Sequence, residues 1–316
     1  MTPTLYMAIP CYNEELVLDE TSKRLSSKYD ALLASGKISP QSRICFINDG
    51  SKDKTWEKIS ELHAAQPNLF SGINLSRNRG HQNALLAGLM TIKDFADCVI
   101  SMDADLQDDI DTIDAMLEKF SEGYEVIYGV RDNRDTDTSF KRETAGLYYK
   151  LMRNLGAENI PNSADFRLMS KRALDGLAEF REVNLFLRGM VPLVGYKSTV
   201  VYYKRGERFA GESKYPFKKM LSFAIDGITS MSATPMRIIF WTGLFSFLVA
   251  LILGIYVIVR HTLNQTSMGW SSIVIAVVGI GGVQLLALGV IGEYIGKIFL
   301  EVKQRPRYLI QDFLNK

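Results

Sequence analysis

The chain has 316 residues, enough for one sizeable catalytic domain and a smaller second part. Its formal net charge is +2 at pH 7, from 37 Lys and Arg against 35 Asp and Glu, and no basic run with interleaved aromatic residues precedes residue 200. This balance excludes a typical nucleic-acid-binding surface, so we expect no nucleic-acid partner.

The three cysteines, Cys11, Cys45 and Cys98, are far apart and lie in apolar runs without CxxC spacing or nearby histidines. Such a pattern is typical of buried reduced thiols in a cytosolic domain and not of a disulfide framework or a zinc site. The first residues lack a basic segment followed by a long apolar stretch, so we expect no cleavable signal peptide.

Short apolar runs alternate with helical stretches along the N-terminal part of the chain, which predicts an α/β fold. Strands are expected at residues 5–10, 43–48, 72–75 and 125–130, with another that begins at Val99 and runs into Asp103 and Asp105. The intervening helical stretches predict βαβ units and a mainly parallel sheet covered on both faces.

A polar loop follows each of the first four strands. In parallel sheets, ligands bind at the carboxyl ends of the strands, near the point where the strand order reverses. Taken singly, each loop is typical of ordinary turn and helix-capping chemistry. Four in succession predict one shared polar site, formed by residues 10–15, 48–53, 76–81 and 103–108.

The fourth loop carries the acidic pair Asp103 and Asp105. A continuous strand would place both carboxylates on one side, with Gln107 adding a neutral oxygen, so the three side chains predict a site for one hard cation. Mg²⁺ or Mn²⁺ accepts such a sparse oxygen set together with a nucleotide diphosphate. The alternative is that these residues only cap a helix at residues 109–120.

Basic residues gather after the fifth strand, as an acceptor that ends in a phosphate monoester would require. Arg131 is the favoured candidate because it lies at a strand end, and Arg142 belongs to the same basic group. The alternative for Arg134 and Lys141 is a solvated loop in which nearby aspartates dilute the charge.

Residues 162–169 predict a short strand with Asp165 and Arg167 on one side and Phe166 and Leu168 on the other. This placement fits a functional pair, and it also fits a structural salt bridge between Asp165 and Arg167 or a helix cap. The side chains alone do not decide between these interpretations.

Residues 205–215 are basic and interrupted by glycine, which is typical of a mobile loop that closes over a diphosphate. Arg208 and Lys214 are the residues that we expect to support the leaving group there. The alternative is a basic linker attracted to anionic lipid, and the two roles are compatible.

Two stretches near the C-terminus, residues 238–259 and 270–291, each contain 22 residues without a charge. Each is long enough to cross a hydrocarbon core of about 30 Å, so two transmembrane helices are expected. Lys and Arg flank the pair and are scarce between them, which predicts cytoplasmic termini. Residues 217–232 predict an amphipathic interface helix, and glycine-rich faces on the second span suit a homo-oligomer.

The loop sequences together resemble glycosyltransferase family 2, and more narrowly its polyprenyl-phosphate glycosyltransferases, the group that holds bactoprenol glucosyltransferase and dolichol-phosphate mannose synthase. The matching phrases are A-I-P-C-Y-N-E-E, N-D-G-S-K-D, L-S-R-N-R-G, D-A-D-L-Q-D, D-F-R and R-x-x-G-x-S-K. The resemblance covers essentially the whole chain, including both apolar stretches, and it implies a GT-A fold.

The resemblance also implies roles for individual residues. It places nucleotide-sugar contacts at Pro10, Tyr12, Asn13, Glu14, Asp49, Asp103, Arg208 and Lys214. It implies metal ligands at Asp103, Asp105 and Gln107, catalytic roles for Asp105 and Asp165, and acceptor-phosphate contacts at Arg131, Arg142 and Arg167. Because a phosphate monoester is largely ionised at neutral pH, Asp165 is expected to position the acceptor or to act as a weak base.

The expected organisation is a cytosolic GT-A domain over residues 1–215, an interface helix over 216–235, and two transmembrane helices with a cytosolic tail over 236–316. By resemblance, the expected enzyme is a metal-dependent, inverting hexosyltransferase of the cell membrane. It moves one hexose from a UDP-sugar to undecaprenyl phosphate, releasing UDP, for cell-envelope glycan modification. Glucose is favoured, then N-acetylglucosamine.

Two other functions stay open: a transferase that uses another nucleotide sugar, and an inactive membrane module that only binds one. A processive polysaccharide synthase is disfavoured because the sequence has no Q-x-x-R-W motif and no further apolar spans.

Overall fold

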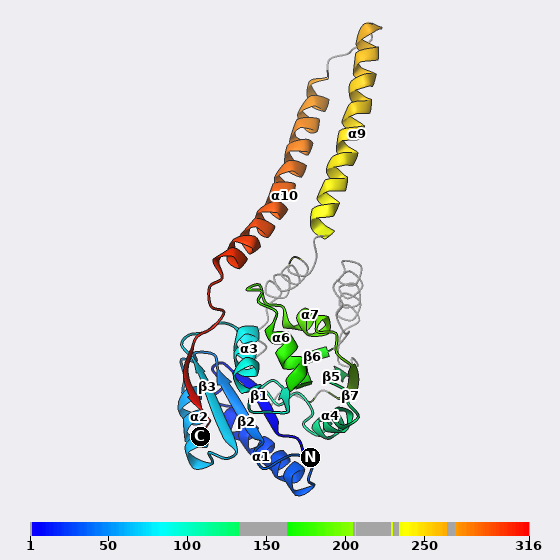
Figure 1. The fold of residues 1–316 in the computed structure, drawn as a ribbon. Coiled ribbons are helices and arrows are strands. Elements are labelled where there is room, and N and C mark those ends of the chain that lie inside the picture. Colours follow the sequence, from blue (N-terminus) through cyan, green and yellow to red (C-terminus); the bar gives the residue numbers. More distant parts are fainter. Residues whose placement is uncertain are drawn as a thin grey trace.

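The computed structural model describes residues 2–132, 163–204, 206, 229, 234–263 and 269–315. These residues form a sheet domain covered by helices and a long helical hairpin that projects from it (Figure 1). The predicted site residues Arg142, Arg208 and Lys214, and most of the predicted interface helix, lie outside the described residues.

One sheet of eight strands forms the centre of the domain, in the order β7-β5-β6-β4-β1-β2-β3-β8. The strands are β1 (Leu5–Cys11), β2 (Arg43–Asn48), β3 (Phe70–Leu75), β4 (Cys98–Ser101), β5 (Val126–Arg131), β6 (Ser163–Ser170), β7 (Ser198–Tyr203) and β8 (Ile310–Leu314). The neighbours β3, β2, β1 and β4 are parallel, so their carboxyl ends and the polar loops that follow them lie at one edge of the sheet.

The α/β prediction is confirmed, and the sheet is mixed. The strand β6 lies between β4 and β5 and is antiparallel to both, while β5 and β7 are parallel. The sequence pattern did not predict this insertion, because the alternation of apolar residues reports which face of a strand is buried and not the direction of its neighbours.

Helices cover both faces of the sheet (Figure 1). They are α1 (Leu18–Ala34), α2 (Thr55–Ala65), α3 (His81–Ile92), α4 (Thr112–Ser121), α6 (Lys171–Ala178) and α7 (Leu187–Leu193). One apolar core joins α1, α2 and α4 to Leu5, Met7 and Ile9 of β1. The other joins α3, α6 and α7 to Tyr6 and Ala8, which point to the opposite face because successive strand residues alternate.

The cysteines lie in β1, β2 and β4, where Cys11, Cys45 and Cys98 are buried and form no disulfide, as predicted. Burial raises the pKa of each thiol. The three side chains therefore act as small apolar core residues and not as nucleophiles.

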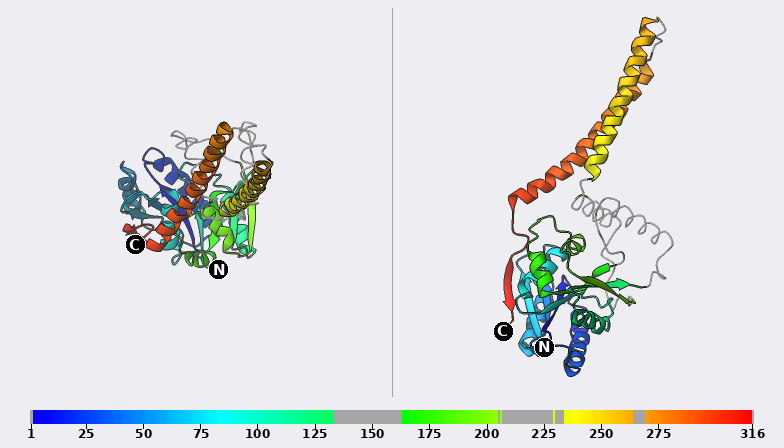
Figure 2. Two further views of the ribbon diagram at one scale, coloured as in Figure 1. Left: turned by 90° about the horizontal axis from the view of Figure 1, so that it is seen from above. Right: turned by 45° about the vertical axis from the view of Figure 1, so that its right-hand side comes forward.

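The hairpin consists of α9 (Thr234–Thr262) and α10 (Trp270–Lys303), which contain the two apolar stretches (Figures 1 and 2). Large apolar side chains lie exposed along it, among them Phe245 and Ile252 on α9 and Leu286 on α10. Within the described residues, one segment, Gly279–Lys303, is long and apolar enough to cross a membrane. Exposed apolar surface on this scale indicates association with a membrane.

The chain returns from α10 to the sheet domain and ends in β8, which pairs antiparallel with the edge strand β3 (Figure 1). Asn74 on β3 donates its Nδ2 hydrogen bond to Asp312 Oδ2 on β8 at 3.0 Å. The sequence predicted only a cytosolic tail here. Because β1 and β8 belong to one sheet, both ends of the chain lie on the same side of the hairpin.

Candidate active site

The loops after β1 and β2 brace each other. Asn13, which has a φ of 53°, donates its amide to Ser51 Oγ at 3.0 Å and accepts the Lys52 amide at its Oδ1 at 2.9 Å. The loop after β1 is therefore held against its neighbour at the carboxyl edge of the sheet. The predicted nucleotide contacts lie at the end of β1 and in this loop, at Pro10, Tyr12, Asn13 and Glu14, and they stay predictions.

Asp49 at the end of β2 is 2% exposed and organises the loop after β3. Its Oδ1 accepts the Arg79 amide at 2.7 Å and its Oδ2 accepts the Gly80 amide at 2.9 Å. Gly50 has a φ of +61°, and a Cβ there would lie 2.5 Å from the carbonyl carbon of Arg77, so only glycine permits this approach. Asp49 therefore has this structural role, and its predicted contact with the nucleotide sugar stays a prediction.

The turn after β4 carries the acidic pair. Because β4 ends at Ser101, the prediction of one continuous strand through Asp103 and Asp105 is wrong. Leu106 has a φ of 57°, and the Gln107 amide donates to Asp105 Oδ1 at 3.2 Å. The three predicted metal ligands therefore lie on a turn that is closed by an aspartate side chain, and not on a strand, and their role stays a prediction.

A histidine connects this turn to β6. His81 Nε2 lies 3.6 Å from Asp103 Oδ1 and 3.4 Å from Asp165 Oδ2. Desolvation, together with the carboxylates of Asp108, Asp165 and Asp105, raises the pKa of Asp103 to about 6, although His81 opposes this shift. The Asp103 side chain is 36% exposed, so negative charge accumulates where a ligand can reach it.

Asp165 is the most strongly held carboxylate of the site. Arg167 Nη2 lies 2.6 Å from its Oδ1, and Arg188 on α7 donates from Nη2 to Oδ2 at 3.0 Å and from Nε to Oδ1 at 3.3 Å. Desolvation works to raise the pKa of Asp165, but Arg188, His81 and Arg167 outweigh it and hold that pKa well below its usual range. Asp165 is therefore a carboxylate anion at neutral pH.

The predicted facing of the β6 residues is confirmed, since Phe166 and Leu168 lie in the apolar core and Asp165 and Arg167 lie together on the opposite face. Arg167 is 2% exposed and forms the salt bridge with Asp165 that the sequence offered as a structural alternative. Its role in binding the acceptor phosphate stays a prediction.

Arg131 ends β5 close to the acidic turn. Its Nε donates to the Tyr203 hydroxyl at 3.2 Å, and its Nη2 lies 3.6 Å from Asp108 Oδ1. Desolvation works to lower the pKa of Arg131, but Tyr203, Asp108 and Asp103 raise it. A cation is therefore fixed beside Asp108, and its predicted contact with the acceptor phosphate stays a prediction.

The predicted diphosphate loop starts next to the acidic turn, because the Gly206 amide donates to the Gln107 carbonyl at 2.9 Å. Arg208 and Lys214, which the sequence analysis assigned to this loop, lie outside the described residues, as does Arg142. Their roles stay predictions.

The oxygen ligands of the acidic turn fit a hard cation in their chemistry. In the described ranges, no group of three or more His, Cys, Asp and Glu side chains is arranged to hold a metal ion. Asp103, Asp105 and Gln107 supply two carboxylates and one amide, a set that suits Mg²⁺ or Mn²⁺ when diphosphate oxygens and water complete the coordination. Desolvation is the largest cause of the raised pKa of Asp103, and the carboxylates of Asp108, Asp165 and Asp105 add to it.

His81 and Arg188 were not predicted as site residues. For His81 there was a signal, because it ends a polar loop and starts a helix after Gly80, whose φ is +85°. Arg188 lies on a separate helix, 23 residues from Asp165 in the sequence. A buried carboxylate such as Asp165 requires a cationic partner, and only this requirement could have indicated that an arginine such as Arg188 lies nearby.

Two family models match the chain. Residues 6–177 match glycosyl transferase family 2, and residues 234–298 match the GtrB C-terminal hairpin. The first match spans β1 to α6 and contains the acidic turn, Asp165 and His81. The second spans α9 and most of α10. The catalytic domain and the hairpin are therefore each recognised by sequence, and the GT-A-like fold expected for the domain agrees with the observed mixed sheet.

Named relatives are similar over almost the whole chain. The uncharacterized glycosyltransferase YkoT of Bacillus subtilis is 50% identical over 99% of this chain and 93% of its own length. A bactoprenol glucosyl transferase of Shigella phage SfX is 37% identical over 96% of this chain and 98% of its own. A solved glucosyl-3-phosphoglycerate synthase of Mycobacterium tuberculosis, with Mn²⁺, UDP and phosphoglyceric acid, has a TM-score of 0.45 and 16% identity, covering 72% and 76% of the two chains. A likeness this distant carries no argument about the site.

Proposed function

The chain belongs to glycosyl transferase family 2, and from that premise we propose that it transfers one hexose, glucose first, from a UDP-sugar to a polyprenyl phosphate such as undecaprenyl phosphate, releasing UDP. The bactoprenol glucosyl transferases at 37% identity support both the sugar and the lipid. The membrane hairpin supports a lipid acceptor, because a soluble acceptor would not require one.

The observation that carries the proposal is that the imidazole of His81 contacts two carboxylates that lie on different parts of the fold. His81 lies between Asp103, on the acidic turn, and Asp165, on β6. A sugar donor at Asp103 and an acceptor at Asp165 would therefore meet within a few ångströms. Such proximity is what a direct displacement between two bound substrates requires.

On the donor side, we assign Asp103, Asp105 and Gln107 to a divalent cation, Mg²⁺ or Mn²⁺, which when bound offsets the charge of the departing diphosphate. The loop after β1, braced by Ser51 and Lys52, is suited to hold the nucleoside because its backbone is fixed. Arg208 and Lys214 are assigned to the diphosphate by sequence.

On the acceptor side, the phosphate oxygen of the lipid attacks the anomeric carbon while the bond from that carbon to the UDP oxygen breaks and its electron pair leaves with UDP. This displacement inverts the anomeric centre. Arg131 and the outward part of Arg188, whose side chain is 39% exposed, are suited to hold the acceptor phosphate. Asp165 is an anion beside Arg188 and orients this guanidinium. Its lowered pKa makes it a weak base, and the ionised acceptor phosphate does not require proton removal.

The proposed location is the cell membrane, with the catalytic domain and both termini in the cytoplasm. The same-side placement of β1 and β8 and the excess of Lys and Arg outside the hairpin support this orientation. Homo-oligomerisation through α10 stays a prediction.

A transfer assay tests the function. The purified full chain in nanodiscs receives undecaprenyl phosphate, Mg²⁺ or Mn²⁺ and a panel of radiolabelled UDP-sugars, and lipid-linked label is measured. We expect label from UDP-glucose in the wild type and none from Asp103→Asn. Label from another nucleotide sugar alone would replace the donor assignment. Binding of a nucleotide sugar without any lipid-linked product would favour a binding module.

A further inference from the structure

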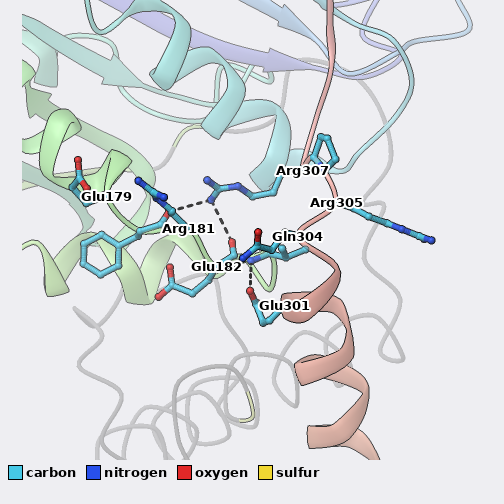
Figure 3. Close-up of a pocket in the computed structure, with 10 residues that line it drawn as sticks. Glu179, Arg181, Glu182, Glu301, Gln304, Arg305 and Arg307 are labelled. Atoms are coloured by element: carbon cyan, nitrogen blue, oxygen red, sulfur yellow. Dashed lines mark hydrogen bonds between the residues drawn. The ribbon is translucent and has the colours of Figure 1, made fainter.

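A cavity of about 630 Å³ lies where the membrane hairpin joins the catalytic domain (Figure 3). One wall is residues 179–183, which follow α6, and the other is the end of α10 with residues 304–307. Three arginines and three glutamates line it, so their charges balance and indicate no charged ligand; they are Arg181, Arg305, Arg307, Glu179, Glu182 and Glu301. The cavity is better described as a junction between two parts of one chain.

Glu301, near the C-terminal end of α10, joins the two walls. Its Oε2 accepts the Val183 amide at 2.9 Å, and its Oε1 accepts the Asn184 amide at 2.8 Å and Asn184 Nδ2 at 2.7 Å. Asn184 Nδ2 also donates to the Lys297 carbonyl at 3.2 Å, one helical turn earlier. Because the acceptor is a carboxylate, these bonds are stronger than neutral ones.

A second tie lies beside the first. Arg307 Nη1 donates to the Phe180 carbonyl at 3.4 Å and to the Glu182 carbonyl at 3.3 Å (Figure 3). The carbonyls of residues 180 and 182 are thus bonded to the segment after α10, and the amides of residues 183 and 184 are bonded to α10 itself. This loop is not free to move independently of α10.

The same loop leads directly into α7. The Leu187 amide, at the start of α7, donates to Gln82 Oε1 at 2.8 Å, and Gln82 follows His81 on α3. Arg188, which follows Leu187 on α7, donates to both oxygens of Asp165. Only residues 185 and 186 separate the amides held by Glu301 from the first residue of α7.

We propose that Glu301 is a positioning residue for the transferase reaction: through Val183 and Asn184 it fixes the start of α7, and so holds Arg188 against Asp165. The end of the membrane helix is therefore part of the construction of the acceptor site. This inference rests on the proposed function, because Arg188 matters for activity only if Asp165 and Arg188 meet the acceptor.

The kinetic test uses the full chain in nanodiscs with Glu301→Ala and the matched control Glu182→Ala. Glu182 lines the same cavity, but within the part of the chain that the structure describes its side chain forms no hydrogen bond or ion pair. For Glu301→Ala we expect the KM for undecaprenyl phosphate to rise about tenfold while the KM for the UDP-sugar stays within about twofold. A merely stabilising role would lower the active fraction and leave both KM values unchanged. The control should behave as the wild type.

The conservative variant Glu301→Gln keeps one neutral carbonyl acceptor in place of two carboxylate oxygens, so we expect its KM for the lipid to lie between those of the wild type and Glu301→Ala. An unchanged lipid KM in both variants overturns the proposal. So does an equal rise in Glu182→Ala.

Hydrogen exchange measured by mass spectrometry provides a readout that does not depend on activity. In Glu301→Ala we expect faster exchange at residues 183–184 and through α7, with β1 to β4 as protected as in the wild type. Faster exchange confined to residues 183–184 would overturn the coupling. If the wild type transfers no sugar, the proposed function fails, and the exchange of α7 still decides whether Glu301 holds this helix.

Discussion

Arg188 Nη2 and Asp165 Oδ2 lie 3.0 Å apart, although α7 and β6 carry them on separate elements. The same carboxylate is bonded to Arg167 from its own strand. The two arginines differ in exposure, because the Arg167 side chain is 3% exposed and that of Arg188 is 39% exposed. One carboxylate thus has a buried structural partner and an accessible one, and the two can be separated by mutation.

Arg188→Ala should abolish most activity at little cost in stability. Asp165 keeps Arg167 and His81 as partners, and a partly exposed ion pair contributes little to folding. We expect the rate of transfer to fall by about 100-fold, because an oriented cation at the acceptor is lost. The measurements are lipid-linked label and thermal unfolding, with Arg181→Ala as the control. Full activity in Arg188→Ala would remove this residue from the acceptor site.

Arg167→Ala should act through stability. Removing a buried cation from a paired carboxylate costs about 3–5 kcal/mol, because the desolvated charge that remains loses part of its compensation. We expect a clear fall in the unfolding temperature and in the yield of folded protein. A variant that unfolds at the wild-type temperature and fails only in lipid binding would instead support the predicted phosphate-binding role of Arg167.

The contribution of Asp165 to the free energy of unfolding should be lost at acid pH. The pKa of Asp165 is held well below its usual range, so its contribution is fully present above the unfolded value of about 4 and is lost as the pH falls through the lower folded value. We expect the difference in unfolding temperature between the wild type and Asp165→Asn to be constant from about pH 5 to pH 6 and to shrink below about pH 4. Above about pH 6 the difference also reflects loss of the proton of His81, because desolvation works to lower the pKa of this residue but Asp165 and Asp103 raise it. A difference that already shrinks near pH 6 would contradict the lowered pKa.

Asp105→Asn should abolish turnover while leaving the fold intact. The substitution keeps the side-chain oxygen that accepts the Gln107 amide, and it removes the charge assigned to the cation. We expect the transfer rate to fall by at least about 100-fold, with an unchanged unfolding temperature. Asp109→Asn, an exposed acid on the same loop, is the control. Turnover of Asp105→Asn like that of the wild type, or wild-type activity in excess EDTA, would remove the metal assignment.

Deletion of residues 309–316 should destabilise the catalytic domain. It removes the β3–β8 ladder and the bond from Asn74 to Asp312, and it leaves β3 as an unpaired edge. At about 0.5–1.5 kcal/mol for each hydrogen bond lost, we expect a loss of about 2–4 kcal/mol, seen as a lower unfolding temperature and more aggregation. Deletion of residue 316 alone, which keeps the hydrogen bond from the Tyr6 hydroxyl to Asn315 Oδ1, is the control. An unchanged unfolding temperature after the longer deletion would mean that β8 adds nothing to the sheet.

The sequence by itself determined the features that depend on local pattern. Alternation of side chains in residues 165–168 correctly placed Phe166 and Leu168 in the core and Asp165 beside Arg167, because side chains of a strand alternate between its faces. The uncharged apolar stretches at 238–259 and 270–291 lie within two long helices, α9 and α10, and the prediction that both cross a membrane stays a prediction. The loop motifs correctly indicated the family.

Only the tertiary structure decided how distant segments meet. The insertion of β6, the return of β8 to the edge of the sheet, and the meeting of Arg188 and His81 at Asp165 all join elements that no local spacing relates. The turn that replaces the expected strand at Asp103 has the same origin, since β4 continues only as far as its pairing with β1 and β6. Strand pairing and charge compensation are properties of neighbours in space, and they therefore appear only in the folded chain.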